Sequence, residues 1–573
     1  MNAAQSVFSG VLFILALICS TGTIPANSSI DAMLPENTIL YMQAGPAGLD
    51  AAMKFLSTKL PASGDEESTK DRIEKGINDW LGEFSKETGA NKDELKKALN
   101  SITSVNFAIT DFQKVYMEYE PSILFTLQTD NCAFFDGLLQ SAVKKSVLEE
   151  TDSAANVKIY GVSSDENREV LSESMSFLFE NEELLLCTAQ NKYFCLSNNA
   201  NTLKAFVTAT KTAPAKSLAT NAKYLKTKAI QSNNDFLRGY FDFAAFRTGW
   251  EKCMEGEEWS KKYWASLFEG LDFNTLGSIG MASSKTDGKF MSKTAFFTQG
   301  ENQLAKTFFN QPAAENTLFN VMPSDSFLCI WANAGDGKAT WANIQKWLSD
   351  VEPYLFENED IFGNIKEAEE TIGVTFDEIA GNVNGETAIF IKTGGEFGID
   401  GGFACTVKDA NAAAVIAKKI ESAITESENE LFNEKKYKDV AIRYNDSEEY
   451  GEFSKAAYCF LENKYFVFAG SCESLEKIVD EFKDKKTLAF SEDFKKKTAF
   501  LPKKASKLMY FDLNGLKSSP LAMILGSDDM FDSINEFTGS VSYTTETPGQ
   551  VTITSDSPMG PAGILIFSAV AGF

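Results

Sequence analysis

Short apolar runs recur along the chain, separated by turn residues and by longer stretches with helical spacing. The segments 38–43 and 326–332 each follow a proline and are rich in Ile, Leu and Phe, which favours a buried strand. Similar runs predict further strands at 105–110, 122–127, 157–161, 176–179, 184–188 and 192–197, and at 387–392, 402–407, 440–444, 456–461 and 465–469. Tyr-Phe-Asp strands ending at Asp242 and Asp512 then lead to closing hairpins, with turns predicted at 286–288 and 546–549.

Helical regions alternate with these strands. They are predicted at 49–60, 70–87, 132–147, 200–209 and 222–231, and at 339–350, 361–371, 412–425, 474–482 and 491–500. Thr129 and Asp409 stand just before two of these helices, where their side chains can accept hydrogen bonds from free backbone N–H groups. Because strands mostly meet their neighbours through short turns, the sequence predicts an α+β fold: mostly antiparallel or mixed sheets with helices packed on them.

The two halves of the chain repeat one pattern. Matched segments include 34–40 with 322–328, 91–95 with 375–379, 191–194 with 463–466, 240–242 with 510–512, and 277–279 with 539–541. The offset between matched residues falls from 288 at the first pair to 262 at the last, as expected when loops shorten while elements persist. A period of this size is that of a large domain rather than of a solenoid repeat. The sequence therefore predicts two homologous tandem domains, 30–319 and 320–573.

Composition limits the chemistry that this chain can perform. Its net charge is −26, from 80 acidic and 54 basic residues. Because the phosphate backbone of nucleic acids is negative and binds basic surfaces, no nucleic-acid partner is expected. Histidine is absent, which excludes Ser-His-Asp and Cys-His nucleophiles, His-ligated zinc and haem held by a proximal histidine. The chemistries that remain are carboxylate pairs, Ser-Lys dyads, acid–base catalysis by tyrosine or lysine, and oxygen-ligated metals.

The N-terminus is typical of an export signal. Residues 7–18 form an apolar run of 12 residues, too short to span a membrane, and small residues follow it. We interpret residues 1–26 as a signal peptide and expect an exported protein, periplasmic or extracellular. Cys19 follows Ile18, whereas a lipoprotein cysteine follows a small residue, so lipid attachment is not expected.

Eight cysteines follow Cys19, and an even number in an exported chain can form a disulfide framework. The internal repeat argues otherwise. Cys187 and Cys459 occupy matched positions, but Cys195 matches Val467. Because thiols exchange with apolar residues between the halves, we expect most of these cysteines to fill core volume.

The recurring acidic residues are candidates for catalysis or metal binding. Asp93-Glu94 and Asp377-Glu378 follow Asn91 and Thr375 at the spacing of a capping box, so we interpret them as helix starts. Asp242 and Asp512 end strands, where an aspartate usually starts a turn by accepting backbone N–H bonds.

Ser141 and Lys144 have the spacing of a Ser-Lys dyad, but the matched region 413–418 has no serine. The chain has none of the common nucleotide-binding, hydrolase, Cys-x-x-Cys or calcium-loop motifs. The sequence therefore predicts no catalytic, cofactor-binding or metal-binding residue, and no cofactor.

The last residues, 560–573, are uncharged and mostly apolar. We interpret them as a final buried element of the second domain. The alternative is a tail that associates weakly with a membrane, because the segment is too short to span one alone.

Several segments resemble a family. They are Leu34-Pro35 with Thr38, the run Asp377–Ile389, Val407–Ala410, the hairpin Leu461–Ser471, and Leu488-Ala489 with Phe494. Together they resemble a bacterial family of exported proteins built from a domain of unknown function, with no established activity. The resemblance implies export and fold but no chemistry, because its motifs are turns, caps and strands.

Two hypotheses of function follow. The first is a non-enzymatic exported protein of the bacterial envelope that acts as a binding or scaffolding module, with an envelope protein or an extracellular ligand as its partner. The alternative is a histidine-free hydrolase, such as a glycosidase, that uses two carboxylates about 5 to 10 Å apart.

Overall fold

The computed structural model describes most of the chain outside its two termini. The described residues are 30–45, 91–115, 118–164, 184–254, 258–286, 289–300, 307, 311–355, 360–394, 399–428, 432–445, 456–512 and 541–557. Several predictions lie outside these residues: the signal peptide 1–26 with Cys19, the helices 49–60 and 70–87, the strand 176–179 and the tail 560–573.

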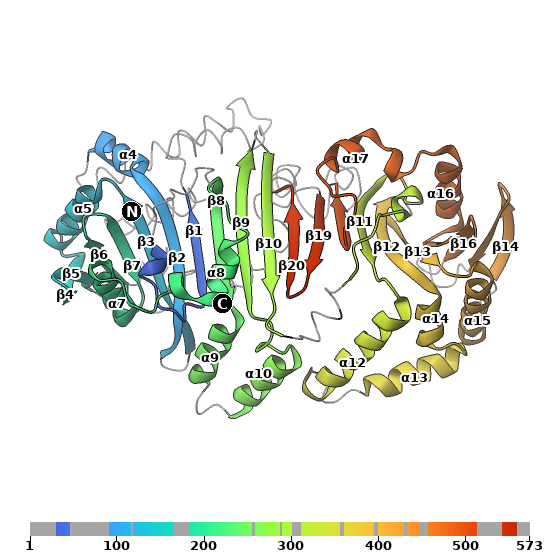
Figure 1. The fold of residues 1–573 in the computed structure, drawn as a ribbon, viewed down its shortest axis with the longest axis horizontal. Coiled ribbons are helices and arrows are strands. Elements are labelled where there is room, and N and C mark those ends of the chain that lie inside the picture. Colours follow the sequence, from blue (N-terminus) through green and yellow to red (C-terminus); the bar gives the residue numbers. More distant parts are fainter. Residues whose placement is uncertain are drawn as a thin grey trace. The chain divides into compact units, whose positions relative to one another are not determined.

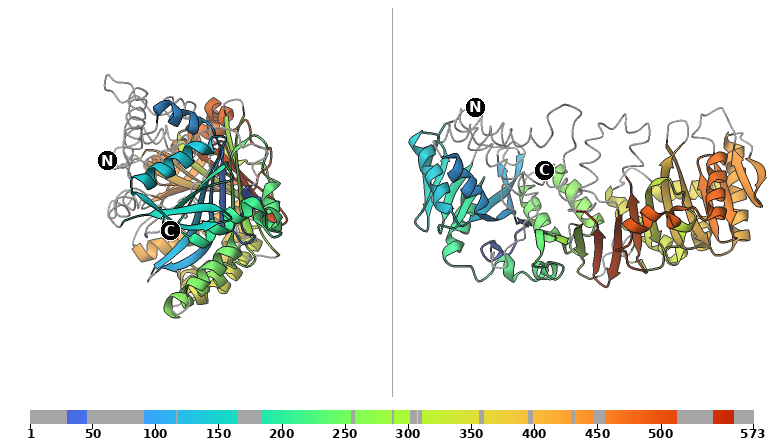
Figure 2. Two further views of the ribbon diagram at one scale, coloured as in Figure 1. Left: turned by 90° about the vertical axis from the view of Figure 1, so that its left-hand side faces the viewer. Right: turned by 90° about the horizontal axis from the view of Figure 1, so that it is seen from above.

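Helices and antiparallel strands are combined throughout, which confirms the α+β class (Figure 1, Figure 2). The chain divides into two compact units, which are described separately. Described residues up to 262, together with 276–297, form the first unit; 263–275 and 298–557 belong to the second. The boundary that the sequence places at 319–320 stays a prediction about homologous domains.

The strands of the first unit lie side by side, and each is antiparallel to its neighbours. They are β1 (Leu40–Ala44), β2 (Ile102–Val115), β3 (Glu118–Thr129), β4 (Leu148–Ala154), β5 (Val157–Val162), β6 (Leu185–Ala189), β7 (Tyr193–Ser197), β8 (Asp235–Asp242), β9 (Ser278–Thr286) and β10 (Lys289–Phe297). Successive pairings give the order β4-β5-β6-β7-β3-β2-β1-β8-β9-β10. Because β1 joins β2 to β8, the N-terminal strand lies inside the sheet and has a neighbour on each side.

Helices and short 3-10 turns complete the first unit. They are η1 (Ile30–Ala32), α4 (Lys92–Asn100), α5 (Cys132–Lys144), α7 (Ala200–Lys211), η2 (Leu218–Thr220), α8 (Ala222–Lys228) and α9 (Phe243–Cys253); α10 (Glu258–Gly270) follows. Leu203, Phe206 and Val207 of α7 pack into a core with the inward face of β1, β6 and β7. Burial of this apolar face is the main force that holds the helix on the sheet.

The second unit has the same kinds of element. Its strands are β11 (Ser326–Asn333), β12 (Val383–Thr393), β13 (Ile399–Val407), β14 (Phe432–Tyr437), β15 (Val440–Asn445), β16 (Ala457–Leu461), β17 (Tyr465–Ala469), β18 (Lys507–Phe511), β19 (Val541–Thr547) and β20 (Gln550–Ser555). Its helices are η3 (Leu318–Asn320), α12 (Gly337–Leu355), α13 (Ile361–Ile372), α14 (Phe376–Asn382), α15 (Ala410–Glu428), α16 (Cys472–Asp484), η5 (Leu488–Phe490) and α17 (Glu492–Lys497).

The strand order of the second unit is β14-β15-β16-β17-β13-β12-β11-β18-β19-β20. It repeats the order of the first unit strand for strand. Backbone contacts repeat as well: the N–H of Leu218 donates to the carbonyl of Leu34 at 3.0 Å, and that of Leu488 donates to Met322 at 2.9 Å. Positions that hold the same place in strand order and register are called equivalent below.

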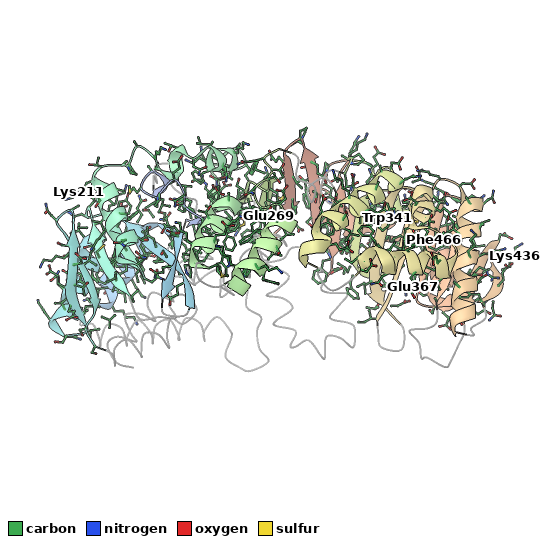
Figure 3. The ribbon with its side chains drawn as sticks, turned by 90° about the horizontal axis from the view of Figure 1, so that it is seen from below. Lys211, Glu269, Trp341, Glu367, Lys436 and Phe466 are labelled. Atoms are coloured by element: carbon green, nitrogen blue, oxygen red, sulfur yellow. The ribbon has the colours of Figure 1, made fainter. Side chains whose placement is uncertain are left out.

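The structure adds elements that the sequence pattern does not predict. Strands β4 and β14 carry mostly exposed charged residues, including Lys436 (Figure 3), so they lack the apolar run by which the other strands were recognised. Charged side chains suit their position at the end of the strand order, because they discourage pairing with another chain. Helix α9 was also missed, because the pattern predicted a turn after Asp242.

Candidate functional site

The acidic pairs lie in the first turns of capped helices, and one of their four residues takes part in the cap. Thr375 accepts the N–H of Glu378 at 3.1 Å, and the Glu378 carboxylate accepts the N–H of Thr375 at 2.9 Å, which completes a capping box. The hydrogen bond from the Thr375 N–H lowers the pKa of Glu378. In the first unit Asn91 accepts the N–H of Asp93 at 2.8 Å, so Asn91 caps α4 but Glu94 does not complete a box.

Asp409 and Thr129 differ in their role. Asp409 accepts the N–H groups of Asn411 and Ala412 at 2.8 and 3.2 Å and so caps α15, as predicted. Thr129 lies too early to cap α5, which begins at Cys132 with Asn131 as its N-cap. Instead the Thr129 hydroxyl accepts the N–H of Asn131 at 3.1 Å, in a turn that precedes the helix.

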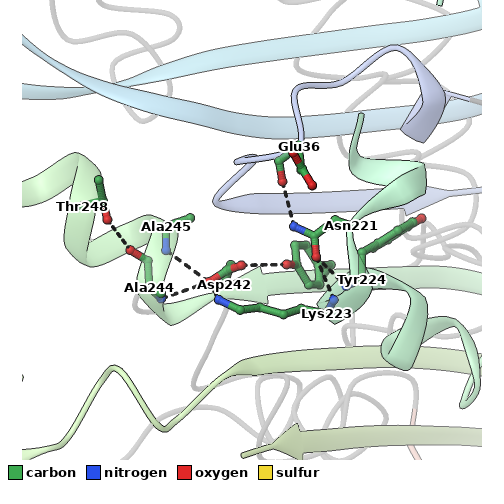
Figure 4. A network of polar contacts seen from close by, with 9 residues as sticks. Glu36, Asn221, Lys223, Tyr224, Asp242, Ala244, Ala245 and Thr248 are labelled. Atoms are coloured by element: carbon green, nitrogen blue, oxygen red, sulfur yellow. Dashed lines mark hydrogen bonds and ion pairs between the residues drawn. The ribbon is translucent and has the colours of Figure 1, made fainter. Parts of the chain in front are cut away.

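Asp242 is the centre of a buried polar network in the first unit (Figure 4). Its carboxylate accepts the N–H groups of Ala244 and Ala245 at 2.9 and 3.1 Å, the Tyr240 hydroxyl at 2.9 Å and the Lys223 ammonium at 2.7 Å. Burial, and then the charge of Asp242, raise the pKa of Tyr240. Asp242 therefore starts a helix rather than the turn that the sequence predicted, and its acceptor sites are filled by the protein's own donors.

Asp512 repeats part of this arrangement in the second unit. It accepts the Tyr510 hydroxyl at 3.2 Å and lies 3.1 Å from the Lys497 ammonium. The lysine comes from a different position: Lys223 is the second residue of α8, whereas Lys497 is the last of α17. Both units thus build a Tyr–Asp–Lys cluster, but only the aspartate and the tyrosine are equivalent.

Glu386 of β12 is a buried carboxylate surrounded by neutral donors. It accepts the N–H and the hydroxyl of Thr317, both at 2.6 Å, the N–H of Leu318 at 3.3 Å and the indole N–H of Trp331 at 3.0 Å. These donors fix the opening 3-10 turn of the second unit to its sheet. The equivalent residue of the first unit is Ser104, which accepts from the Asn106 amide at 3.1 Å.

A second buried carboxylate, Glu421 of α15, forms an ion pair with Arg443. The guanidinium donates two hydrogen bonds to it, at 2.9 and 2.7 Å, and the Tyr458 hydroxyl donates a third at 2.5 Å. Burial alone would raise the pKa of Glu421, but the bonds from Arg443 and Tyr458 outweigh it, and the pKa is lowered. The Tyr458 ring packs on Phe466 with 5.5 Å between centroids (Phe466 is labelled in Figure 3).

The remaining candidates do not form a reactive centre. Ser141 and Lys144 lie in the last turns of α5, where Ser141 is half-buried and Lys144 is exposed. Cysteines 132, 187, 195, 253, 329, 405 and 459 are free and buried, and Cys472 is free and half-buried. Among the described residues, no group of three or more Cys, Asp or Glu side chains is placed to hold a metal ion.

One surface feature was not predicted from the sequence. Ile330, Ile389 and Phe468 are 45%, 52% and 37% exposed although they lie on inner strands of the second unit. Ile330 is opposite both Met509 and Ile389, Ile389 is opposite Phe403, and Phe403 is opposite Phe468. Because directly opposite residues share a face, these five residues form one line across β18, β11, β12, β13 and β17, called the apolar row below.

The equivalent line of the first unit is largely covered. It consists of Gly239, Met42, Phe107, Phe125 and Leu196. Phe125 and Leu196 are buried, and Met42 and Phe107 are half-buried. The two units therefore differ on a face whose strand pairing is the same.

The chain matches no family model and no curated protein. Two solved structures, crystal forms I and III of TP0453, align with 50% of this chain and 88% of their own, at 10% and 9% identity. Their TM-scores are 0.24 and 0.21, too low to carry an argument about fold or function. Among the described helices, none combines the length and the apolar character needed to cross a membrane.

Proposed function

We propose that this chain is a non-enzymatic exported protein of the bacterial envelope, built from two homologous tandem domains, that binds a partner through the apolar row. The repeated strand order and the matched backbone bonds support the duplication. The apolar run at 7–18 and the resemblance to an exported family support the export of the chain.

The apolar row carries the proposal of binding. It exposes large apolar side chains in a contiguous line, and such lines on protein surfaces mark sites of interaction. The buried carboxylates, by contrast, already accept hydrogen bonds from the protein's own groups, as Asp242, Glu386 and Glu421 do. Residues of this kind hold a fold together, and they support a scaffold rather than a reaction.

The dimensions of the apolar row fit an amphipathic helix. Five strands at about 4.8 Å give a line of about 19 Å, which equals the length of about 13 helical residues. The net charge of −26 favours a basic partner. The proposed partner is therefore a helix of an envelope protein with one apolar face and lysine or arginine on the other.

A model peptide tests this binding site. The probe is a 14-residue helical peptide with leucine on one face and lysine on the other, and its affinity for the full-length protein is measured by fluorescence anisotropy. The double variant Ile330→Ser, Ile389→Ser removes two central contacts. We expect its Kd to rise at least tenfold, because burying each isoleucine contributes about 1.5–3 kcal/mol.

The matched control is Val415→Ser, which removes an equally exposed apolar side chain (56%) from α15, outside the apolar row. Its Kd should equal that of the wild type. An unchanged Kd in the double variant would attribute the binding to charge alone, and equal weakening in the control and the double variant would attribute it to apolar contacts outside the row. Either result would overturn the proposed site, as would a wild type that does not bind the peptide.

The hydrolase alternative has its own test. A broad hydrolase screen of the purified protein should show no turnover if the chain is a binding module. Turnover that disappears on a single carboxylate change would replace the binding proposal with the carboxylate mechanism. No observation on the described part of the chain favours that mechanism.

The proposal also assigns a role to the apolar tail, residues 560–573. We propose that it closes the second domain and does not hold the protein to a membrane. Truncation before residue 560 should then lower the melting temperature without changing membrane fractionation. An unchanged melting temperature with a shift to the soluble fraction would support weak membrane association through the tail instead.

A further inference from the structure

Two cysteines of the first unit face each other across neighbouring strands. Cys187 of β6 is directly opposite Cys195 of β7, and both are fully buried. Directly opposite residues of antiparallel strands have Cα atoms about 4.5 or 5.5 Å apart. Both spacings fall within the range of about 4.4–6.8 Å that a disulfide requires.

Comparison with the second unit shows whether packing alone requires two cysteines at these positions. At the equivalent positions Cys459 is opposite Val467, and both are buried in the core of that unit. One thiol in this place therefore fills volume, and valine serves equally well as its neighbour. In the first unit a second cysteine, Cys195, replaces that valine, so two thiols lie opposite each other.

We propose that Cys187 and Cys195 are a disulfide site that closes the β6–β7 hairpin when the chain folds in the presence of a disulfide oxidant. The thiolate of one cysteine attacks the oxidant and releases one thiolate from it, leaving a mixed disulfide. The second cysteine thiolate then attacks that bond and releases the other half. Two protons and two electrons leave the pair, and the oxidant is reduced to two thiols.

The surroundings determine when the bond forms. Burial raises the pKa of Cys195 well above its usual value, so in the folded unit this thiol stays protonated and reacts slowly. Oxidation must therefore precede the packing of α5 and α7 on these strands. The nearby Cys132 thiol donates to the carbonyl of Tyr193 at 3.5 Å, and burial raises its pKa to about 11. This contact holds Cys132 beside the pair without placing it opposite either thiol.

Oxidative refolding of the full chain tests the proposal. The reduced, denatured protein is refolded with oxidised and reduced glutathione, alkylated in denaturant and analysed by peptide mass spectrometry without reduction. We expect two fewer alkylated cysteines than in the reduced protein, and one cross-linked peptide that contains Cys187 and Cys195. Reduction should lower the melting temperature of the first unit by about 5 °C, since closing this loop restricts the unfolded chain.

The matched variant is Cys195→Val, which places in the first unit the residue that the second unit carries. It should fold, lose the cross-link and show a melting temperature that does not depend on reductant. Cys187→Ala provides a second variant with the same expected loss. Complete alkylation of the refolded wild type, or a cross-link from Cys132 to either cysteine, would overturn the assignment.

Discussion

The two units attach their opening 3-10 turns differently, the first through an ion pair and the second through packed aromatic rings. In the first unit Asp31 of η1 is buried and forms an ion pair of 2.6 Å with Lys228. Burial, and then the charge of Asp31, raise the pKa of Tyr224. At the matching places of η3 and α17 the second unit has Phe319 and Phe494 instead of Asp31 and Tyr224. The two phenylalanine rings pack edge to face with centroids 5.1 Å apart.

The polar anchor of the second unit lies elsewhere, at Glu386 and Trp331, where the first unit has Ser104 and Gln43. Each unit fixes its first turn to the sheet, but with different groups. The fold therefore requires an anchor at this place and does not require a particular residue. This is what a structural role predicts, since a reaction would require the same chemical groups.

The largest expected effect is the loss of the second unit's anchor. Glu386→Ala should leave the Thr317, Leu318 and Trp331 donors buried without an acceptor, and lower the free energy of unfolding by about 3 kcal/mol or more. Ser104→Ala, its equivalent, should cost about 1 kcal/mol. Urea denaturation of both variants measures the difference. Equal losses would show that Ser104 stabilises its unit as much as Glu386 does, which contradicts the difference between the two anchors.

The Tyr–Asp–Lys clusters give a smaller contrast. Asp242→Ala removes the N-cap of α9 together with the Lys223 contact and should cost about 2 kcal/mol. Asp512→Ala removes a more exposed carboxylate and should cost about 1 kcal/mol. Asp242→Asn provides the control, because an asparagine can still cap the helix. If Asp512→Ala proved the more damaging of the two, helix capping would not be the source of the difference.

Local pattern was sufficient where apolar and polar residues recur with the period of a single helix or strand. The helix predicted at 361–371 is observed as Ile361–Ile372, and the strand predicted at 440–444 as Val440–Asn445. The anchors could not be predicted, because the donors to Glu386 lie 55 to 69 residues away in the sequence. The apolar row could not be predicted either. Both faces of its strands are apolar and carry helices, since Phe403 packs in one cluster with Ala410 and Ala413 of α15. The sequence does not show which side chains of that face remain exposed.

The smallest expected effect is the pH dependence of the stability that the ion pair between Glu421 and Arg443 provides. Arg443 has a neutral equivalent in the first unit, Tyr160, and the amide of Gln140 in α5 donates to the Tyr160 hydroxyl at 2.8 Å. The pKa of Glu421 is lowered on folding, so its contribution to stability is complete above the unfolded pKa of 4.5 and is lost as the pH falls through the folded pKa. A quarter of the Arg443 side chain is exposed, and solvent screening therefore keeps the effect small.

Urea denaturation of the wild type and Glu421→Gln between pH 3 and 7 measures this contribution. The difference in unfolding free energy between the two proteins should be constant above about pH 5 and shrink as the pH falls below 4.5. Gln140→Ala is the control from the first unit, and its difference from the wild type should not change with pH. A Glu421→Gln difference that is also independent of pH would show that the ion pair adds no more than the neutral hydrogen bond of the first unit.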